Sequence, residues 1–173
     1  MSYSELFSKC VEILLKLEGG YSNRKSDKGG ETNFGISSRS YPDINIKTLT
    51  RERAIEIYYN DYWIPMNIDR LQNDLLILHL FCFGVNAGTR TAIKILQKLV
   101  GAYSDGLIGS KTRKAIRLFE GNIAEEFIKR EKLFYVSLVQ HKPEQRVNLK
   151  GWLNRINNIN FYYDRVFTGI TGE

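Results

Sequence analysis

Apolar residues recur with helical spacing along nearly the whole chain. Near the N-terminus they stand three and four positions apart, on one face of a predicted helix that ends at Glu18. The same period, interrupted by Gly, Pro, Asn and Asp, predicts further helices at about 50–63, 73–86, 92–101, 110–119, 122–141 and 149–167. No segment alternates apolar and polar residues with period two. We therefore expect an all-α or nearly all-α fold, with at most a short β element between residues 19 and 49.

Polar residues and prolines indicate where several of these helices start and stop. Ser2 with Glu5, and Asn122 with Glu125, have the spacing of a capping box, in which two side chains satisfy free amides of the first turn. Pro65 is expected to end the helix that precedes it, because a residue before proline is biased away from helical backbone.

The predicted helix at 73–86 is apolar on nearly all sides. A helix without a polar face must be covered by its neighbours, so we expect this one to be the central buried helix. His79 is therefore expected to be a hydrogen-bonded core residue and not a catalytic one. Cys10 and Cys82 also stand in apolar helical runs, without metal-ligand spacing, and are expected to be buried free thiols.

Composition and charge narrow the possible partners. The 173 residues suffice for one domain with a real core, and no apolar run is long enough to span a membrane. The net charge of +6 suits an anionic polymer such as nucleic acid, acidic lipid or a cell-wall polymer. The basic residues are spread along the chain and form no single stripe, so we rank nucleic-acid binding last.

Glu18 is the strongest candidate for chemistry. It continues the spacing of Phe7, Val11 and Leu14, which places its carboxyl group on the buried face of the first helix. Loss of water favours the neutral form of a carboxyl group, and a neutral carboxyl group can protonate the leaving oxygen of a glycoside. Alternatively, Glu18 is the solvated last residue of a helix that ends at two glycines. Glutamate there opposes the helix dipole, so its position needs a reason.

The glycine-rich segment after Glu18 holds two possible partners for it. Asp27 follows across a Gly-Gly turn, and Thr32 lies five residues beyond Asp27. Glycosidic hydrolysis usually needs two carboxylates, or one carboxyl group and a polarised water. A loop that folds back can bring Asp27 opposite Glu18 and let the Thr32 hydroxyl hold the water. Alternatively, Asp27 is an Asx-turn residue, a role compatible with catalysis.

Aromatic and amide side chains further along can line a sugar groove. Tyr62 and Trp63 belong to an aromatic cluster near the end of the 50–63 helix, where helical spacing directs some of the rings into the core. The others can stack on pyranose rings. Asn86 ends the central helix, where its amide can reach an N-acetyl group or, alternatively, cap the helix.

Several short motifs follow one another over most of the chain, from about residue 8 to about residue 165. They are Glu18-Gly19-Gly20-Tyr21-x-Asn23, Asp27-x-Gly29-Gly30-x-Thr32-Asn33-x-Gly35-Ile36, Tyr58-x-x-Asp61-Tyr62-Trp63, Phe83-Gly84-Val85-Asn86-x-Gly88, Asp105-Gly106-x-Ile108-Gly109-x-x-Thr112 and Gly151-Trp152-x-x-Arg155. Each is weak alone, but in this order they resemble the glycoside hydrolase 108 family, N-acetylmuramidases that are often described as secretion activator proteins.

The resemblance implies a lysozyme-like helical fold and hydrolysis of the β-1,4 bond between N-acetylmuramic acid and N-acetylglucosamine in peptidoglycan. Glu18 matches the expected catalytic acid of the family. Asp27 and Thr32 match a Glu, Asp and Thr set of phage-type lysozymes, so we expect all three residues to be catalytic. The residues expected to bind substrate are Tyr21, Asn33, Tyr62, Trp63 and Asn86.

The resemblance also implies two functional regions. We expect a lysozyme-like catalytic domain at 1–94 and a helical, peptidoglycan-binding lobe at 95–173, packed together as one compact unit. The expected partner is the peptidoglycan glycan strand, and we expect no cofactor, metal, nucleic acid or membrane insertion, and a monomer. Since no signal peptide is visible, we expect synthesis in the cytoplasm and action on the cell wall after export or lysis.

Two positions depart from the family pattern. Cys82 stands where the family usually has Asp before Phe83, and Asn23-Arg24-Lys25 replaces the usual Asn-Asp-Pro. Neither change touches Glu18. The substitution at Cys82 nevertheless keeps an alternative open, in which the protein binds peptidoglycan but is catalytically weak or inactive.

Overall fold

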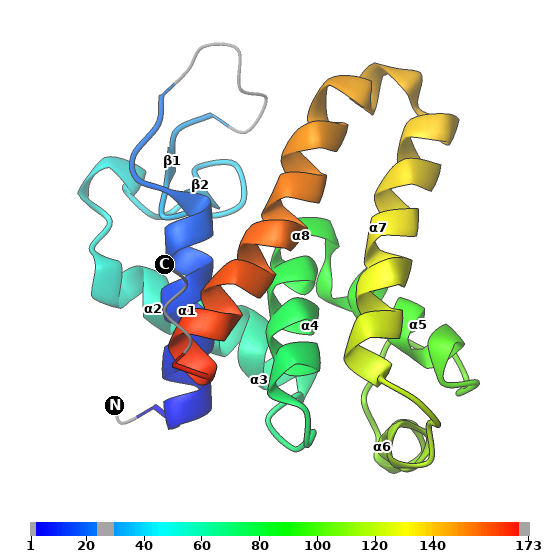
Figure 1. Ribbon diagram of the computed structural model, residues 1–173. Coiled ribbons are helices and arrows are strands. Elements are labelled where there is room, and N and C mark those ends of the chain that lie inside the picture. The colour runs from blue at the N-terminus through cyan, green and yellow to red at the C-terminus, as the bar shows by residue number, and fades with distance from the viewer. Residues whose placement is uncertain (1–2, 24–29, 170–173) are drawn as a thin grey trace. The chain divides into compact units, whose positions relative to one another are not determined.

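The computed structural model describes residues 3–23 and 30–169, and helices dominate these segments. The chain divides into two compact units, residues 1–61 and 62–173. The first contains α1 (Glu5–Glu18), the strands β1 (Thr32–Asn33) and β2 (Ile36–Ser37), the 3-10 turn η1 (Ile46–Thr48) and α2 (Arg51–Tyr58). The π-helical turn η2 (Tyr59–Trp63) leads to α3 (Ile64–Met66), α4 (Asp74–Ala87), α5 (Thr89–Leu99), α6 (Ser110–Arg117), α7 (Ile123–His141), η3 (Pro143–Gln145) and α8 (Arg146–Phe167). The predicted all-α fold with a short β element between residues 19 and 49 is confirmed (Figure 1).

Helix α1 buries the apolar face that its sequence predicts. Phe7, Cys10 and Leu14 have no exposed surface. The helix is capped by Ser4, whose hydroxyl oxygen accepts the amide hydrogen of Phe7 at 3.2 Å. The sequence predicted the cap at Ser2, and this was wrong, because Ser4 already satisfies an amide of the first turn. Ser2 itself lies outside the described residues.

Helix α2 contacts α1 within the first unit. Arg51, the first residue of α2, forms an ion pair with Glu12 of α1. The ring of Tyr59, directly after α2, meets the ring of Phe7 edge-on at 4.9 Å between centroids. The polar and aromatic contacts together hold the two helices against each other.

The strands β1 and β2 form an antiparallel hairpin in which Thr32 lies opposite Ser37. The segment after α1 adds to this hairpin, because Ser22 and Thr32 exchange two backbone hydrogen bonds of 2.8 and 2.9 Å. The hairpin therefore lies near the C-terminal end of α1, where Glu18 stands (Figure 1).

Side-chain caps begin three helices where the sequence predicted them. Thr50, Asn73 and Asn122 each accept the amide hydrogen of the residue three positions further on. The helical chain after Thr50, however, runs through Pro65, which was expected to end it. The π-helical turn η2 interrupts the α-helical hydrogen bonding, so Pro65 lies in the first turn of α3. Proline is tolerated there because a first-turn amide has no helical partner to lose.

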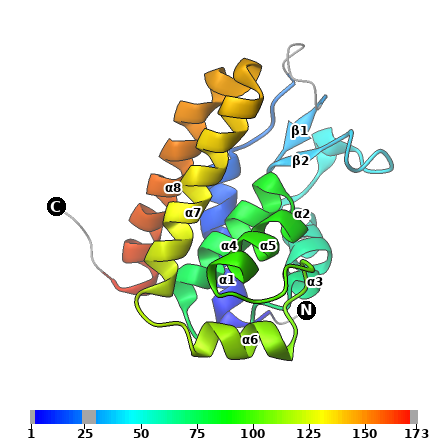
Figure 2. The ribbon, with the colours of Figure 1, turned by 90° about the vertical axis from the view of Figure 1, so that its right-hand side faces the viewer.

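Helix α4 is the centre of the second unit, as predicted. Every residue from Leu76 to Gly84 is buried. The helix packs against α5, α7 and α8 (Figures 1 and 2). Phe83 meets three aromatic rings of α7 edge-on, with centroid distances of 6.2 Å to Phe127, 5.2 Å to Phe134 and 5.7 Å to Tyr135. This aromatic cluster fixes α7 on α4.

His79 of α4 is a hydrogen-bonded core residue, as predicted. Its Nδ1 lies 2.8 Å from Oε2 of Glu131 on α7, and its Nε2 lies 2.9 Å from Oδ1 of Asn160 on α8. His79 is 0% exposed and Glu131 is 2% exposed. The network therefore joins three helices away from water. Cys10 and Cys82 are buried thiols that form no disulfide bond, as predicted.

The turn between α5 and α6 is organised by the buried side chain of Gln97. Its amide nitrogen donates to Oδ1 of Asp105 at 2.7 Å and to the Leu107 carbonyl at 3.0 Å, and its amide oxygen accepts from the Gly106 N–H at 2.8 Å. The hydrogen bond from Gln97, followed by that from the Leu107 N–H, lowers the pKa of Asp105 below its ordinary value. Helix α6 starts after this turn at Ser110, where the helix at 110–119 was predicted to begin.

Helices α7 and α8 lie side by side (Figures 1 and 2). The rings of Tyr135 and Trp152 stack between them, with centroids 4.8 Å apart. Helix α8 begins at Arg146, earlier than the predicted start at residue 149, because the turn η3 leads directly into it. None of the helices in the described segments has the length and apolar character required to cross a membrane.

The division after Asp61 differs from the domain boundary at residue 94 that the sequence led us to expect. Helices α4 and α5 both pack against α7, so their contacts place them with the C-terminal helices. The expected domains at 1–94 and 95–173 describe functional regions, and as such they stay a prediction.

Candidate active site

Glu18 is the last residue of α1 and is followed by the glycine-rich segment. Gly19 ends the helix with φ 75°, a left-handed backbone that favours glycine, and its N–H donates to the Leu15 carbonyl at 3.3 Å. Glu18 is half-buried. It is therefore not the fully solvated helix end that the alternative interpretation of the sequence required.

The carboxyl group of Glu18 faces the turn of the β1–β2 hairpin. A Cβ atom at Gly35 would lie 2.6 Å from Oε2 of Glu18 and 2.6 Å from the hydroxyl oxygen of Tyr58. Gly35 also has φ 79°, which L side chains rarely adopt. The missing side chain at Gly35 thus lets the carboxyl group of α1 and the hydroxyl group of α2 converge on the hairpin backbone.

Tyr58 holds the hairpin turn in place. Its side chain is 1% exposed, and its hydroxyl group donates to the Phe34 carbonyl at 2.7 Å. Phe34 has φ 52°, an uncommon value for a residue other than glycine, so the turn carries some backbone strain. The hydrogen bond from Tyr58 stabilises this turn next to Glu18.

Glu31 is a second carboxylate of the same unit and is held by two side chains. The Tyr21 hydroxyl and the Asn23 amide donate to the same oxygen, Oε1 of Glu31, at 3.0 and 3.1 Å. Partial desolvation of the phenol, followed by its hydrogen bond to Glu31, raises the pKa of Tyr21 above its ordinary value, so the hydroxyl stays a donor. Tyr21 is 45% exposed, which leaves ring surface for a ligand.

Thr32 and Asn33 of β1 differ in how their side chains are used. The Thr32 hydroxyl makes no hydrogen bond within residues 3–23 and 30–169, so it can hold a water or a ligand. Asn33 is 8% exposed, and its amide donates to the carbonyls of Ile46 and Leu49 at 3.3 and 3.4 Å. It ties the hairpin to η1, and its contact with substrate stays a prediction. Asp27 lies outside the described residues.

The predicted residues Tyr62, Trp63 and Asn86 belong to the second unit, whereas Glu18 belongs to the first. Trp63 is 3% exposed and meets Phe81 edge-on at 5.3 Å, which is a core position. Tyr62 is half-buried, and Asn86 is exposed in the last turn of α4. The alternative that Asn86 caps this helix is wrong, because the cap residue is Gly88 with φ 96°.

Gly35, Tyr58 and Glu31 were not predicted as site residues. The sequence signal for Gly35 was its place in a motif shared with Thr32 and Asn33, since such a glycine often marks a close backbone approach. Tyr58 also stood in a motif, Tyr58-x-x-Asp61-Tyr62-Trp63, whereas Glu31 carried no such signal. Their roles depend on contacts with residues distant in sequence, Phe34 for Tyr58 and Tyr21 for Glu31.

The chemistry available at this site is that of carboxyl, hydroxyl and phenol groups, which transfer protons and form hydrogen bonds. Across the segments that the structure describes, no three His, Cys, Asp or Glu residues are grouped so that they could hold a metal ion.

Comparison with known proteins gives matches along most of the chain. Residues 11–88 match the family model described as Glycosyl hydrolase 108, and residues 91–157 match the model described as Predicted Peptidoglycan domain. Twelve chains of solved structures also match. One is the structure of Brucella abortus SagA, which is 28% identical with a TM-score of 0.75, over 90% of this chain and 91% of that chain. A comparison with curated proteins gave no match.

The first matched region contains Glu18, Gly35 and Tyr58, whose groups converge at the candidate site. The second contains α6 and most of the two long C-terminal helices. The chain therefore matches the glycosyl hydrolase 108 family over residues 11–88 and the predicted peptidoglycan domain over residues 91–157.

Proposed function

We propose that this protein hydrolyses the β-1,4 bond between N-acetylmuramic acid and N-acetylglucosamine in peptidoglycan, with Glu18 as the general acid. The glycosyl hydrolase 108 match supports glycoside hydrolysis, and the predicted peptidoglycan domain supports peptidoglycan as the ligand. The observation that carries the proposal is the half-buried carboxyl group of Glu18, which lies close to Gly35, as does the Tyr58 hydroxyl.

In the proposed reaction, Glu18 in its acid form donates a proton to the glycosidic oxygen while the bond from that oxygen to the sugar breaks. The close approach to Gly35 and Tyr58 restricts where the carboxyl group can lie, and a restricted acid loses less entropy when the substrate arrives. Positive charge then develops on the sugar ring. A carboxylate must stabilise that charge, a water must attack the ring carbon, or both must act.

We propose that Asp27 and Thr32 take these two roles. Asp27 supplies the second carboxylate in the proposal, and Thr32 positions the attacking water. The Thr32 hydroxyl supports its role, because it has no hydrogen-bond partner among the described residues.

The proposed glycan contacts come from side chains with accessible surface. Tyr21 is 45% exposed, Tyr62 is half-buried and Asn86 is exposed, so each can contact a sugar. Asn33 and Trp63 are 8% and 3% exposed. We therefore propose that they support the fold around the site, and their contact with the glycan stays a prediction.

A second candidate is a peptidoglycan-binding protein that is catalytically weak or inactive. It is favoured by Cys82, a thiol with no exposed surface at the position where the family usually has an acid. A thiol there cannot orient a water through a carboxylate. We prefer hydrolysis to this candidate because Glu18, which matches the expected catalytic acid of the family, is half-buried beside Gly35.

Analysis of the products from purified cell walls separates these functions. Walls are digested with the full chain, the released fragments are reduced, and the sugar at the reducing end is identified. Muramic acid at the reducing end supports the proposed bond, whereas glucosamine contradicts it. Binding to insoluble walls without release of fragments supports the second candidate.

A further inference from the structure

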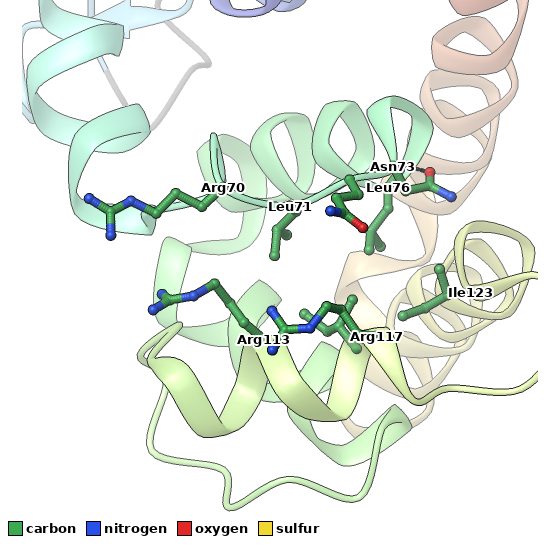
Figure 3. Close-up of a pocket in the computed structure, with 9 residues that line it drawn as sticks. Arg70, Leu71, Asn73, Leu76, Arg113, Arg117 and Ile123 are labelled. Atoms are coloured by element: carbon green, nitrogen blue, oxygen red, sulfur yellow. Dashed lines mark hydrogen bonds between the residues drawn. The ribbon is translucent and has the colours of Figure 1, made fainter.

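A pocket with a cationic rim lies in the second unit, between helix α6 and the segment that leads into α4 (Figure 3). Its volume is about 140 Å³. Arg70 reaches it from the segment before α4, and Arg113 and Arg117 reach it from α6. No acidic side chain is among the residues that line it. The pocket thus combines three guanidinium groups with no compensating carboxylate.

The arginines of the pocket have donors left for a ligand. Arg113 uses Nη1 to donate to the Ile108 carbonyl at 3.1 Å, which also accepts from Asn67 at 2.8 Å. This anchors Arg113 while most of its five N–H groups remain for other partners. Arg70 and Arg117 are exposed and form no ion pair or hydrogen bond with the described residues. An anion at the rim therefore meets guanidinium groups that are not already neutralised.

The floor of the pocket is apolar. Leu71, Leu76 and Ile123 line it and are 8%, 0% and 9% exposed. Figure 3 shows Leu71 and Leu76 on the α4 side and Ile123, at the start of α7, toward one end. A ligand that fills this space has to carry an apolar group as well as a negative charge.

The volume limits the ligand to a small group. A cavity of roughly 150 Å³ holds a molecule the size of benzene, which has six heavy atoms. A terminal alanine also has six heavy atoms, with a methyl group for the floor and a carboxylate for the rim. Arginine binds carboxylates through two parallel hydrogen bonds, which fits such a group. A bare phosphate matches the charge but leaves the apolar floor uncovered.

We propose that this pocket binds the C-terminal alanine of a peptidoglycan stem peptide, with its carboxylate on the arginines and its methyl group on the apolar floor. The inference rests on the proposed function, because that function supplies peptidoglycan as the ligand. The α6 wall and Ile123 lie within the region that matches the predicted peptidoglycan domain, which supports a wall ligand for this pocket. The net charge of +6 favours approach of an acidic peptide.

The test is calorimetric binding of a synthetic stem pentapeptide that ends in two D-alanines to the full chain. The same peptide with a C-terminal amide is the ligand control, and poly(glycerol phosphate) tests a phosphate ligand. The pocket variant is Arg70→Gln with Arg117→Gln, which removes two exposed charges. The matched control is Lys114→Gln with Arg130→Gln, which removes two exposed charges from residues that do not line the pocket.

We expect the free-acid peptide to bind. The C-terminal amide and the pocket variant should each weaken binding by about tenfold or more, as expected for loss of hydrogen bonds to a charged group. The control variant should bind within about twofold of the wild type, since isolated exposed charges contribute little. Equal binding of acid and amide overturns the inference even if the pocket variant fails to fold. Absence of peptide binding also overturns it. So does a result in which the binding of poly(glycerol phosphate), and not that of the peptide, depends on Arg70 and Arg117.

Failure of this inference can be told apart from failure of the proposed function. The stem peptide contains no glycosidic bond, so its binding does not depend on Glu18. A chain that releases muramic-acid-ended fragments but does not bind the peptide loses only the pocket assignment. A chain that binds the peptide through the pocket but releases no fragments loses only the hydrolase assignment.

Discussion

Gly35 determines how closely Glu18 and Tyr58 can approach the hairpin. Both groups lie 2.6 Å from the ideal position of a Cβ atom at residue 35. This distance is too short for any residue other than glycine. The backbone at Gly35 is also left-handed, with φ 79°. One glycine therefore meets two separate requirements, space for the carboxyl group and a turn that only glycine adopts readily.

Replacement of Gly35 by alanine should reduce both stability and activity. The left-handed backbone should cost about 1–3 kcal/mol in the free energy of unfolding. The new methyl group displaces the Glu18 carboxyl group, and we expect wall hydrolysis to fall by about a hundredfold for a misplacement of about 1 Å. Urea unfolding and fragment release measure the two effects. Gly20→Ala is the stability control, since Gly20 has open space around it and no left-handed φ; equal behaviour of the two variants would contradict the argument.

At the scale of elements, the turn between α5 and α6 shows how one buried polar side chain replaces regular hydrogen bonding. Gln97 has no exposed surface, yet its amide satisfies the Gly106 N–H, the Leu107 carbonyl and the Asp105 carboxylate. Buried polar groups without partners are destabilising, so the turn depends on this residue.

Gln97→Leu should therefore lower the free energy of unfolding by about 2–3 kcal/mol, since leucine fills the space but leaves buried polar groups unpaired. Lys98→Ala, at the next and exposed position, should stay within about 0.5 kcal/mol of the wild type. Both values come from urea unfolding at neutral pH. A Gln97→Leu protein as stable as the Lys98→Ala protein would show that the turn holds without the amide.

The lowered pKa of Asp105 predicts a pH dependence for the same turn. A carboxyl group whose pKa is lower in the folded state stabilises the fold above its unfolded pKa of about 3.9, and this contribution is lost as pH falls through the folded value. The free energy of unfolding should thus fall more between about pH 5 and about pH 2 in the wild type than in Asp105→Asn. If the free energy of unfolding falls equally in the two proteins, the charge of Asp105 does not stabilise the fold.

At the largest scale, a buried polar network joins α4, α7 and α8, three helices of the second unit. His79 of α4 contacts Glu131 of α7 and Asn160 of α8, at 2.8 and 2.9 Å. The surrounding contacts are aromatic and apolar and can tolerate small shifts. The hydrogen bonds are directional, so they set how the three helices are aligned.

Removal of Glu131 should be among the most destabilising single changes in this unit. Glu131→Ala leaves the Nδ1 of His79 without its partner in the core, and we expect a loss of about 3–5 kcal/mol in the free energy of unfolding. Glu131→Gln keeps an acceptor oxygen and should lose less. Arg130→Ala, an exposed change on the same helix, should have almost no effect. Equal stability of Glu131→Ala and Arg130→Ala would refute a structural role for the network.

The sequence predicted those features that depend on local periodicity. The all-apolar run at 73–86 identified α4 as the buried centre, and His79 followed as a core residue. The end at Pro65 was wrong because a π-helical turn restarted the helix, which spacing alone does not reveal. The approach of Glu18 to Gly35 and the position of Arg70 and Arg117 around one pocket depend on segments that are distant in sequence, so local patterns carry no signal for them.

The central claim is that Glu18 donates the proton, and Glu18→Gln tests it most directly. Glutamine has nearly the same shape but cannot act as an acid, so we predict an unchanged thermal midpoint and release of fragments from purified walls reduced at least about a hundredfold. Glu52→Gln, an exposed change in the same unit, should release fragments like the wild type. A folded Glu18→Gln protein that degrades walls as fast as Glu52→Gln would contradict the account.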